Sequence, residues 1–287
     1  MRIAWIGTGI MGKSMLNRLA EHGHIIHAYN RTYENMNDLN HNNIFKYRSI
    51  REAISHVDLI MTMVGYPKDV LDVYLGDDGI IENCKQEQIC VDFTTSSPEI
   101  AIKIFNNDRN IEVLDAPVTG GDIGAINGTL SIMVGGTKKT FDKVNPILKI
   151  LGNKINYFGK AGNGQHAKLF NQILVGINVY STAEVLNYCE KNGVDIDVAQ
   201  KIFKSGIGNN WQLNNNGPKM LKSDLAPGFY IKHFIKDLDL VKENQKEYLF
   251  SINEVLKAYK KFSSEADFIS NLGTQSIYEI LKNEDEN

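Results

Sequence analysis

The sequence predicts an α/β domain built on a parallel β-sheet, followed by an all-α domain, with a long helix joining the two. Apolar runs of strand length alternate with helical patterns over the first 160 residues, which is typical of a parallel sheet with crossover helices. A glycine-rich loop directly follows the first of these runs. A largely apolar, proline-free stretch begins near residue 162, and the pattern stays helical after it. We therefore expect one domain over residues 1–161 and a second over residues 162–287.

The composition is that of a water-soluble globular protein and argues against several classes of partner. The 287 residues carry a formal net charge of −3, which gives no basis for binding nucleic acid. There is no run of about 18 apolar residues to span a membrane, and a predicted strand starts almost at Met1, so we expect no signal peptide. Cys84, Cys90 and Cys189 form no CxxC pair, which favours a reducing cytoplasm and argues against a disulfide or metal site.

The first predicted strand, residues 3–6, is followed at once by a G-x-G-x-x-G loop and then by an apolar pattern of helical period. In such a loop the first glycine permits a tight turn, the second lets the backbone approach a pyrophosphate, and the third allows close helix–sheet packing. The helix N-terminus favours the phosphates through its free N–H groups and its dipole. The spacing therefore predicts a Rossmann-type dinucleotide-binding domain, with cofactor contacts at Gly7, Gly9, Ile10, Met11 and Gly12.

The end of the second predicted strand, residues 24–29, indicates which dinucleotide is bound. An NAD enzyme usually places an Asp or Glu here, against the ribose 2′-hydroxyl. The residues are instead Asn30, Arg31 and Thr32, which offer an amide, a guanidinium and a hydroxyl to a 2′-phosphate. We therefore expect NADP(H) to be preferred over NAD(H). The alternative is that Arg31 is a solvated loop arginine.

Two further strands are expected at residues 57–64 and 88–93. In open α/β sheets, ligands lie at the carboxyl ends of the strands. Val64, Gly65 and Thr95 follow or end these strands, so we expect them beside the ribose and the nicotinamide.

The strand expected at residues 111–114 runs into the sequence Asp115-Ala116-Pro117-Val118-Thr119-Gly120-Gly121. Thr119, Gly120 and Gly121 offer a hydroxyl and consecutive backbone N–H groups, and the glycines permit a concave turn that suits a small carboxylate. An ordinary Gly-Gly turn is the alternative. Strands at residues 130–134 and 154–158, on either side of a helix at 138–151, complete the first domain.

The long helix is expected over residues 163–192 and is ended by Gly193. Lys168, Asn171 and Gln172 have the i, i+3, i+4 spacing that places them on one face near its start. The rest of the helix is apolar nearly all round, so we expect it to be buried on several sides. A lysine and two amides on a buried wall need water, a ligand or partners. A lysine that reaches solvent at a helix end is the alternative.

The second domain is expected to be all-α. Helices are predicted from about residue 195 to 203 and over residues 231–248, 252–264 and 273–281, with a loop rich in Asn and Gly over residues 206–218. Lys236 can form a surface ion pair with Asp239 or Glu243, or it can point towards the cofactor. Spacing does not decide between the two.

These stretches together resemble the β-hydroxyacid dehydrogenase family, which includes 3-hydroxyisobutyrate dehydrogenase, tartronate semialdehyde reductase and the glyoxylate/succinic semialdehyde reductases. The resemblance extends from Met1 to about Leu281. It rests on four motifs in order: Gly7-Thr8-Gly9-Ile10-Met11-Gly12, Asp115-Ala116-Pro117-Val118-Thr119-Gly120-Gly121, Gly162-Asn163-Gly164 with Lys168 and Asn171, and Lys236-Asp237-Leu238. The resemblance implies that Lys168 is catalytic and that Asn171 positions the substrate. It also implies a substrate carboxylate site at Thr119, Gly120 and Gly121 and cofactor contacts at Val64, Gly65, Thr95 and Lys236.

The chain departs from the family pattern at positions that bear on the substrate. Thr119 stands where Ser is usual, Gln172 where a second Asn is common, and Gly65 where Pro is usual. The reaction class is unaffected, whereas the substrate is left open. Imine reductases share the architecture but lack the lysine, and the phosphogluconate branch has a far larger helical domain.

We therefore expect an oxidoreductase that interconverts a short-chain semialdehyde or keto acid and its hydroxy acid with NADP(H). Hydride leaves the nicotinamide, and Lys168 gives a proton to the forming alkoxide. The partner is a small carboxylate-bearing substrate, and the apolar linking helix favours a homodimer or homotetramer. The alternatives are a non-catalytic NADP-binding redox sensor, an imine reductase-like relative, and an enzyme that uses Lys168 as a Schiff base.

Overall fold

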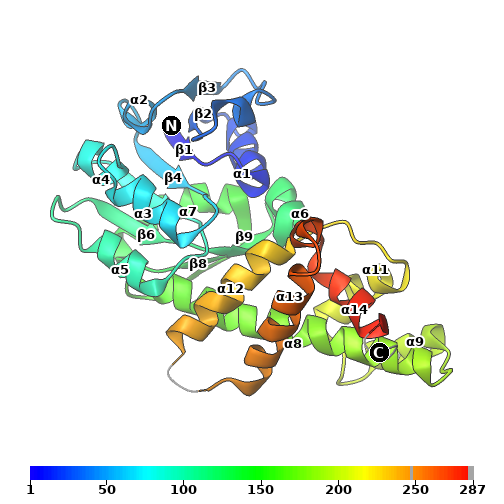
Figure 1. The fold of residues 1–287 in the computed structure, drawn as a ribbon. Helices are drawn as coiled ribbons and strands as arrows, with labels where there is room; N and C mark the ends of the chain where they lie inside the picture. The colour runs from blue at the N-terminus through cyan, green and yellow to red at the C-terminus, as the bar shows by residue number, and fades with distance from the viewer. Residues whose placement is uncertain (246–247, 284–287) are drawn as a thin grey trace. The chain divides into compact units, whose positions relative to one another are not determined.

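A computed structural model of the chain describes residues 1–245 and 248–283 (Figure 1). The chain divides into two compact units, which we call the N-terminal unit (Met1–Lys168) and the C-terminal unit (Leu169–Asn287). The division falls inside helix α8 (Asn163–Lys191). The predicted boundary between residues 161 and 162 lies just before this helix and stays a prediction.

The N-terminal unit is organised around a six-stranded parallel sheet. The strands have the order β3-β2-β1-β4-β5-β6, so the direction in which the chain adds strands reverses between β1 and β4. This is the Rossmann order, in which ligands lie at the carboxyl ends of the strands near the reversal. The predicted α/β fold is confirmed. The strands are β1 (Arg2–Ile6), β2 (Ile25–Tyr29), β3 (Ile44–Tyr47), β4 (Leu59–Thr62), β5 (Ile89–Asp92) and β6 (Glu112–Asp115).

Helices connect these strands and cover both faces of the sheet. On one face, α1 (Ile10–Glu21) and α7 (Lys138–Leu151) contribute to a hydrophobic cluster. The cluster on the other face involves α2 (Ile50–Ile54), α3 (Pro67–Leu75), α4 (Ile80–Asn83) and α5 (Pro98–Phe105), and a 3₁₀ helix, η1 (Tyr33–Met36), precedes β3. The start of α5 shows local capping, because Oγ of Ser97 accepts a hydrogen bond from Glu99 N at 3.2 Å and a proline occupies the first turn.

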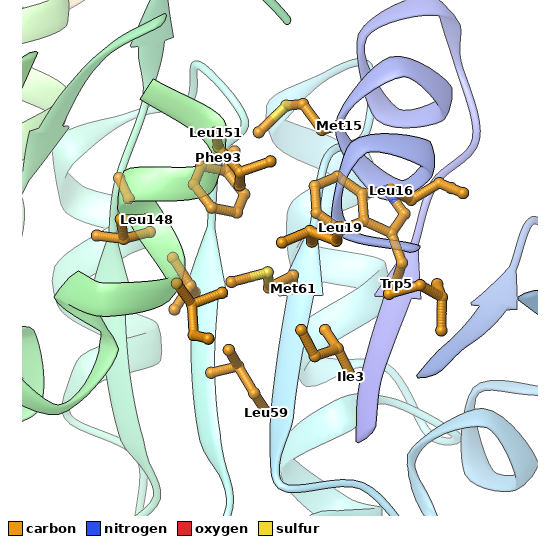
Figure 2. Close-up of a cluster of buried hydrophobic side chains, with 14 of the residues drawn as sticks. Ile3, Trp5, Met15, Leu16, Leu19, Leu59, Met61, Phe93, Leu148 and Leu151 are labelled. Carbon is orange, nitrogen blue, oxygen red and sulfur yellow. The ribbon is translucent and has the colours of Figure 1, made fainter. Parts of the chain in front are cut away.

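Side chains along β1 alternate between the two hydrophobic clusters. Ile3 and Trp5 belong to the cluster with α1 and α7, whereas Ala4 and Ile6 belong to the other. Figure 2 shows the first cluster, in which Trp5 and Phe93 lie among leucine side chains of α1 and α7. Because both faces are covered, the strands appear in the sequence as nearly continuous apolar runs.

A smaller, three-stranded sheet follows β6. It contains β7 (Val118–Thr119), β8 (Leu130–Val134) and β9 (Gly152–Tyr157), with β7 antiparallel and β9 parallel to β8. Backbone hydrogen bonds between Asp115 and Gly135 join the end of β6 to the end of β8. A short helix that the sequence did not predict, α6 (Gly121–Asn127), connects β7 and β8.

The C-terminal unit is helical and has its own hydrophobic core, so the predicted all-α domain is confirmed. Side chains such as Val179 of α8, Phe234 of α12 and Tyr259 of α13 form this core. Within the described ranges, none of the helices is long and apolar enough to cross a membrane. The unit contains α9 (Ile196–Ser205), α10 (Trp211–Asn215), α11 (Gly217–Leu221), α12 (Ile231–Asn244), α13 (Phe250–Ser263), η2 (Asp267–Asn271), η3 (Thr274–Ser276) and α14 (Ile277–Asn283).

Part of the loop predicted over residues 206–218 is helical, so that prediction was wrong. Asn210 caps α10, because its Oδ1 accepts a hydrogen bond from Leu213 N at 2.9 Å. Pro218 lies in the first turn of α11, where its missing N–H costs nothing. The helix predicted over residues 231–248 ends at Asn244, and residues 246–247 of that range lie outside the described residues.

Candidate active site

The turn between β1 and α1 has the shape that a dinucleotide requires. Gly7 has a φ of +98°, and a Cβ there would clash with the carbonyl group of Met63, so glycine is needed. A Cβ on Gly12 would clash with the carbonyl oxygen of Gly7, so glycine also lets α1 pack close. Next to Gly9, in contrast, the described residues leave open space where a Cβ would lie. The loop therefore fits a pyrophosphate at the N-terminus of α1.

At the end of β2, Asn30 lies against the glycine loop. Its Oδ1 accepts a hydrogen bond from Thr8 N at 3.0 Å, and its Nδ2 donates to Thr32 O at 2.9 Å. The side chain of Arg31 is 83% exposed, and its guanidinium lies 3.0 Å from Oδ1 of Asp69. An acid therefore does lie beside Arg31, although it comes from the first turn of α3 and not from β2. Such a solvated ion pair is weak, so another anion can replace Asp69.

Thr94 joins the carboxyl ends of β4 and β5. Its Oγ1 accepts a hydrogen bond from Val64 N at 3.0 Å, and its own N–H donates to the buried carboxylate of Asp92 at 3.1 Å. Asp92 also accepts from Oγ1 of Thr62 at 2.7 Å. Burial raises the pKa of Asp92 to about 6, and these hydrogen bonds oppose the rise. The turn at Val64 and the loop that contains Thr95 are thus held together at the carboxyl edge of the sheet.

The first turn of α8 is tied to the ends of β5 and β6. Asp115, the last residue of β6, accepts a hydrogen bond from Gly162 N at Oδ1 (2.8 Å) and from Gln165 N at Oδ2 (2.9 Å). Burial raises the pKa of Asp115, while these N–H groups act to lower it. The buried side chain of Gln165 accepts from Ser96 N at 2.9 Å and donates to Thr94 O at 2.8 Å. The helix start and the loop of residues 94–96 are therefore held against each other.

Lys168 follows Gln165 by three residues on α8 and so lies on the same side of the helix. Only 6% of Lys168 is exposed, which argues against a lysine extended into solvent. A buried ammonium needs polar or charged surroundings, so its burial near the carboxyl edge is the arrangement expected of a functional lysine.

In the C-terminal unit, Asn171 begins a hydrogen-bonded chain that ties α8 to α12. Its Nδ2 donates to Oε1 of Gln172 at 3.0 Å, and Nε2 of Gln172 donates to Oδ2 of Asp237 at 2.7 Å. Nζ of Lys236 lies 3.0 Å from Oδ1 of Asp237. The predicted substrate amide and the predicted cofactor lysine are thus linked through two buried side chains, Gln172 and Asp237.

The turn after Thr119 has the shape expected of the predicted carboxylate site. Gly120 and Gly121 have φ values of +131° and +65°, a conformation that L-residues rarely adopt. Thr119 is half-buried at the end of β7, and α6 begins at Gly121. The role of these three residues in binding a carboxylate stays a prediction.

Sequence reasoning assigned no role to Asp69, Asp115 or Gln165. Asp115 and Gln165 stand within or beside quoted motifs, which was the available signal. Their partners, however, lie about 50 to 70 residues away in the chain.

Within residues 1–245 and 248–283, no group of three or more His, Cys, Asp or Glu side chains is arranged to hold a metal ion. The three cysteines are buried free thiols.

Comparisons with known proteins agree with this geometry. The family model for the NAD-binding domain of 6-phosphogluconate dehydrogenase matches residues 2–159. The model for the NAD-binding domain of NADP-dependent 3-hydroxyisobutyrate dehydrogenase matches residues 162–266.

Similar proteins cover nearly the whole chain. An uncharacterised oxidoreductase of Bacillus subtilis, YkwC, is 40% identical over 97% of this chain and 98% of its own length. The 2-hydroxy-3-oxopropionate reductase of Escherichia coli is 33% identical over 98% of this chain and 96% of its own. The solved structure of Mycobacterium tuberculosis 3-hydroxyisobutyrate dehydrogenase with L-serine aligns with a TM-score of 0.89 and 26% identity, over 98% and 99% of the two chains. This chain therefore belongs to the 3-hydroxyisobutyrate dehydrogenase family of NAD(P)-binding hydroxyacid dehydrogenases.

Proposed function

We propose that the protein interconverts a short-chain semialdehyde or keto acid and the corresponding hydroxy acid with NADP(H). The placement of Lys168 carries this proposal. It is a buried lysine one helical turn beyond Gln165, whose side chain is bonded to the loop at the carboxyl end of β5. Ligands of Rossmann sheets lie at that edge, so the lysine is well placed to act on a substrate beside the cofactor.

The nicotinamide, when bound, supplies or accepts a hydride at the carbon of the substrate carbonyl. In the reductive direction Nζ of Lys168, as an ammonium, stabilises the negative charge that grows on the substrate oxygen and then protonates it. In the oxidative direction the neutral amine takes the hydroxyl proton. The amide of Asn171 holds the substrate in line, and Thr119, Gly120 and Gly121 bind its carboxylate.

The preference for NADP(H) rests on Arg31. No acidic residue ends β2, and the guanidinium of Arg31 is exposed apart from its ion pair with Asp69. A 2′-phosphate carries more charge than a carboxylate and accepts several hydrogen bonds, so it can compete with Asp69 for Arg31. Thr32, the next residue in the sequence, offers a hydroxyl. Asn30, whose Oδ1 accepts from Thr8 N and whose Nδ2 donates to Thr32 O, can donate through the second hydrogen of its amide.

The test is turnover with NADPH on glyoxylate, succinic semialdehyde, methylmalonate semialdehyde and tartronate semialdehyde, for the wild type and for Lys168→Met. The substitution removes the acid–base group and nearly conserves side-chain volume, so kcat should fall roughly 10²- to 10⁴-fold while NADPH still binds. Lys160→Met, which removes an exposed lysine of the same unit, is the matched control and should keep wild-type activity.

A Lys168→Met variant that kept more than about a tenth of the wild-type kcat would contradict the proposed acid–base role. NADPH binding without turnover on any of the four aldehydes would favour the redox sensor. Covalent trapping of a substrate on Lys168 by borohydride, without cofactor, would identify a Schiff-base enzyme instead. Turnover of cyclic imines but of no aldehyde would favour an imine reductase-like activity.

We also propose that the protein is a cytoplasmic homodimer or homotetramer. Six large apolar side chains on α8 and α9 of the C-terminal unit are exposed, and a second copy can remove such surface from water. The free thiols support a reducing compartment. Light scattering after size-exclusion chromatography tests the assembly, and a monomer at micromolar concentration would contradict it. The exposed apolar side chains on α8 and α9 are Phe170, Leu174, Val185, Tyr188, Val198 and Ile202.

A further inference from the structure

Gln165 uses its whole side-chain amide on the backbone around Thr95. Oε1 accepts a hydrogen bond from Ser96 N at 2.9 Å, and Nε2 donates to Thr94 O at 2.8 Å. The two bonds therefore reach the residues immediately before and after Thr95. Gln165 has no exposed surface, so water cannot replace either bond if the amide rotates.

The backbone of Gln165 is held as firmly as its side chain. Its N–H donates to Oδ2 of Asp115 at 2.9 Å, and the same carboxylate accepts from Gly162 N at 2.8 Å. These N–H groups belong to the helix start, where donors lack partners within the helix. Gly164, one of the two residues between them, has no room for a Cβ, because it lies against backbone oxygens of β6 and β8. The first turn of α8 is thus packed closely at Gly164 against the ends of β6 and β8.

This arrangement sets where Lys168 can lie. Lys168 is three residues beyond Gln165 on a continuous helix, so a change in the position or rotation of the first turn moves its Cα as well. The same Gln165 fixes the loop that carries Thr95, a predicted contact of the nicotinamide end of the cofactor. One side chain therefore sets the spacing between the proton donor and the loop beside the hydride donor.

We propose that Gln165 is a positioning residue for the transfer step. It holds Lys168 and the loop at Thr95 in a fixed position relative to each other. This inference rests on the proposed function of Lys168. Gln165 has no role as a proton donor, since its amide does not titrate and both its polar atoms are engaged with the backbone. Loss of its bonds should leave the reacting groups present but misplaced, and misplacement by about 1 Å can cost about 10²-fold in rate.

Gln88 provides a matched control in the same unit. It is also a buried glutamine, 3% exposed, whose Nε2 donates to Ile54 O at 2.7 Å and Val57 O at 2.8 Å and whose Oε1 accepts from Lys85 N at 2.8 Å. Gln88→Met and Gln165→Met therefore remove similar buried amide hydrogen bonds from similar surroundings. A purely structural role for Gln165 predicts similar effects of both substitutions.

The experiment compares wild type, Gln165→Met and Gln88→Met for NADPH affinity, KM, kcat and the isotope effect with NADPH deuterated at the transferred position. For Gln165→Met we expect kcat to fall roughly 10- to 100-fold, with NADPH affinity and KM within about threefold of wild type. The isotope effect should rise, because a misplaced transfer step becomes rate-limiting. Gln88→Met should keep the wild-type kcat and isotope effect, even where it lowers the melting temperature.

Gln165→Asn is the second variant, and it decides the question if Gln165→Met does not fold. It keeps an amide but is one methylene shorter, so it cannot reach both Thr94 and Ser96, and its kcat should fall at least roughly tenfold. The positioning role would be overturned if a folded Gln165 variant kept more than about a third of the wild-type kcat. It would also be overturned if Gln88→Met lost as much kcat as Gln165→Met. Either result would leave the proposed function of Lys168 standing. A wild type with no turnover on any aldehyde would overturn the proposed function, and the role of Gln165 with it.

Discussion

Replacing Asp92 with asparagine should change how the stability of the N-terminal unit depends on pH. Asp92 is buried at the end of β5, and burial raises its pKa from the ordinary value of 3.8 to about 6. A carboxyl group with a raised pKa holds its proton more tightly in the folded chain than in the unfolded chain. Its ionisation therefore destabilises the fold progressively as the pH rises from about 4 to about 6, and the cost is constant above that range.

The rise in pKa sets the size of the effect. A shift in the pKa of Asp92 from 3.8 to about 6 lowers the free energy of unfolding by about 3 kcal/mol at high pH. About 0.5 kcal/mol of this loss is already present at pH 4. The introduced asparagine would keep an oxygen for the donors Thr62 and Thr94, and the effect of its new NH₂ group does not vary with pH. Relative to wild type, the variant should therefore gain about 2 kcal/mol of unfolding free energy between pH 4 and pH 7.

Trp5 offers a probe within the same unit. Its ring stacks on Phe93 at a centroid distance of 5.8 Å, next to Asp92 in the chain. Urea unfolding is followed by tryptophan fluorescence at several pH values in a Trp211→Phe background, which leaves Trp5 as the only tryptophan. Asp78→Asn, at an exposed position, is the control. The reasoning is refuted if the Asp92→Asn difference varies by less than about 0.5 kcal/mol across this range, a change within the error of extrapolation.

Three further substitutions test other parts of the site. Arg31→Ala should weaken NADPH binding roughly tenfold more than NADH binding, because only NADPH loses a charge-assisted hydrogen bond; equal losses in titrations with the two cofactors would remove Arg31 as the selector. Thr119→Ala should raise KM for the acid with little change in kcat, since a carboxylate contact stabilises ground and transition states alike; an unchanged KM for every substrate would place Thr119 outside the site. Gly164→Ala should destabilise the N-terminal unit by about 1–3 kcal/mol, because its Cβ would clash with backbone oxygens of β6 and β8. Melting curves check this against Gly208→Ala, where the described residues leave open space, and equal melting temperatures would contradict the tight packing.

The parallel strands could be predicted because both of their faces are buried, which produces short apolar runs between helical patterns. β3 (Ile44–Tyr47) was missed for the opposite reason. It lies at the edge of the sheet, and Phe45 is half exposed, so its residues do not form a buried run. The short helices α10 and α11 depend on single residues at their starts, Asn210 and Pro218, and a five-residue helix has no period that a sequence pattern can reveal.

The glycine loop at β1 could be identified because all of its determinants lie within six residues. The surroundings of Lys168 could not be identified in the same way. The carboxylate of Asp115 and the loop at Thr94 reach α8 only after the sheet has brought the ends of β5 and β6 together. The pairing of Arg31 with Asp69 has the same origin, because it joins residues 38 positions apart across two turns. Local motifs indicate which residues take part, whereas tertiary contacts decide what holds them.

The cap of α8 also limits how the two domains can be exchanged between members of the family to make chimeric proteins. Most helices carry their N-cap within their own sequence, but the carboxylate that caps α8 lies 47 positions before Gly162. A peptide or fragment that began at residue 162 would expose its first N–H groups to water and would fray over the turn that carries Lys168. A chimera that takes α8 from a relative must therefore take that relative's equivalents of Asp115 and of residues 94–96 too. The natural point of recombination lies within α8, beyond Lys168, where the contacts of the helix pass to the C-terminal unit.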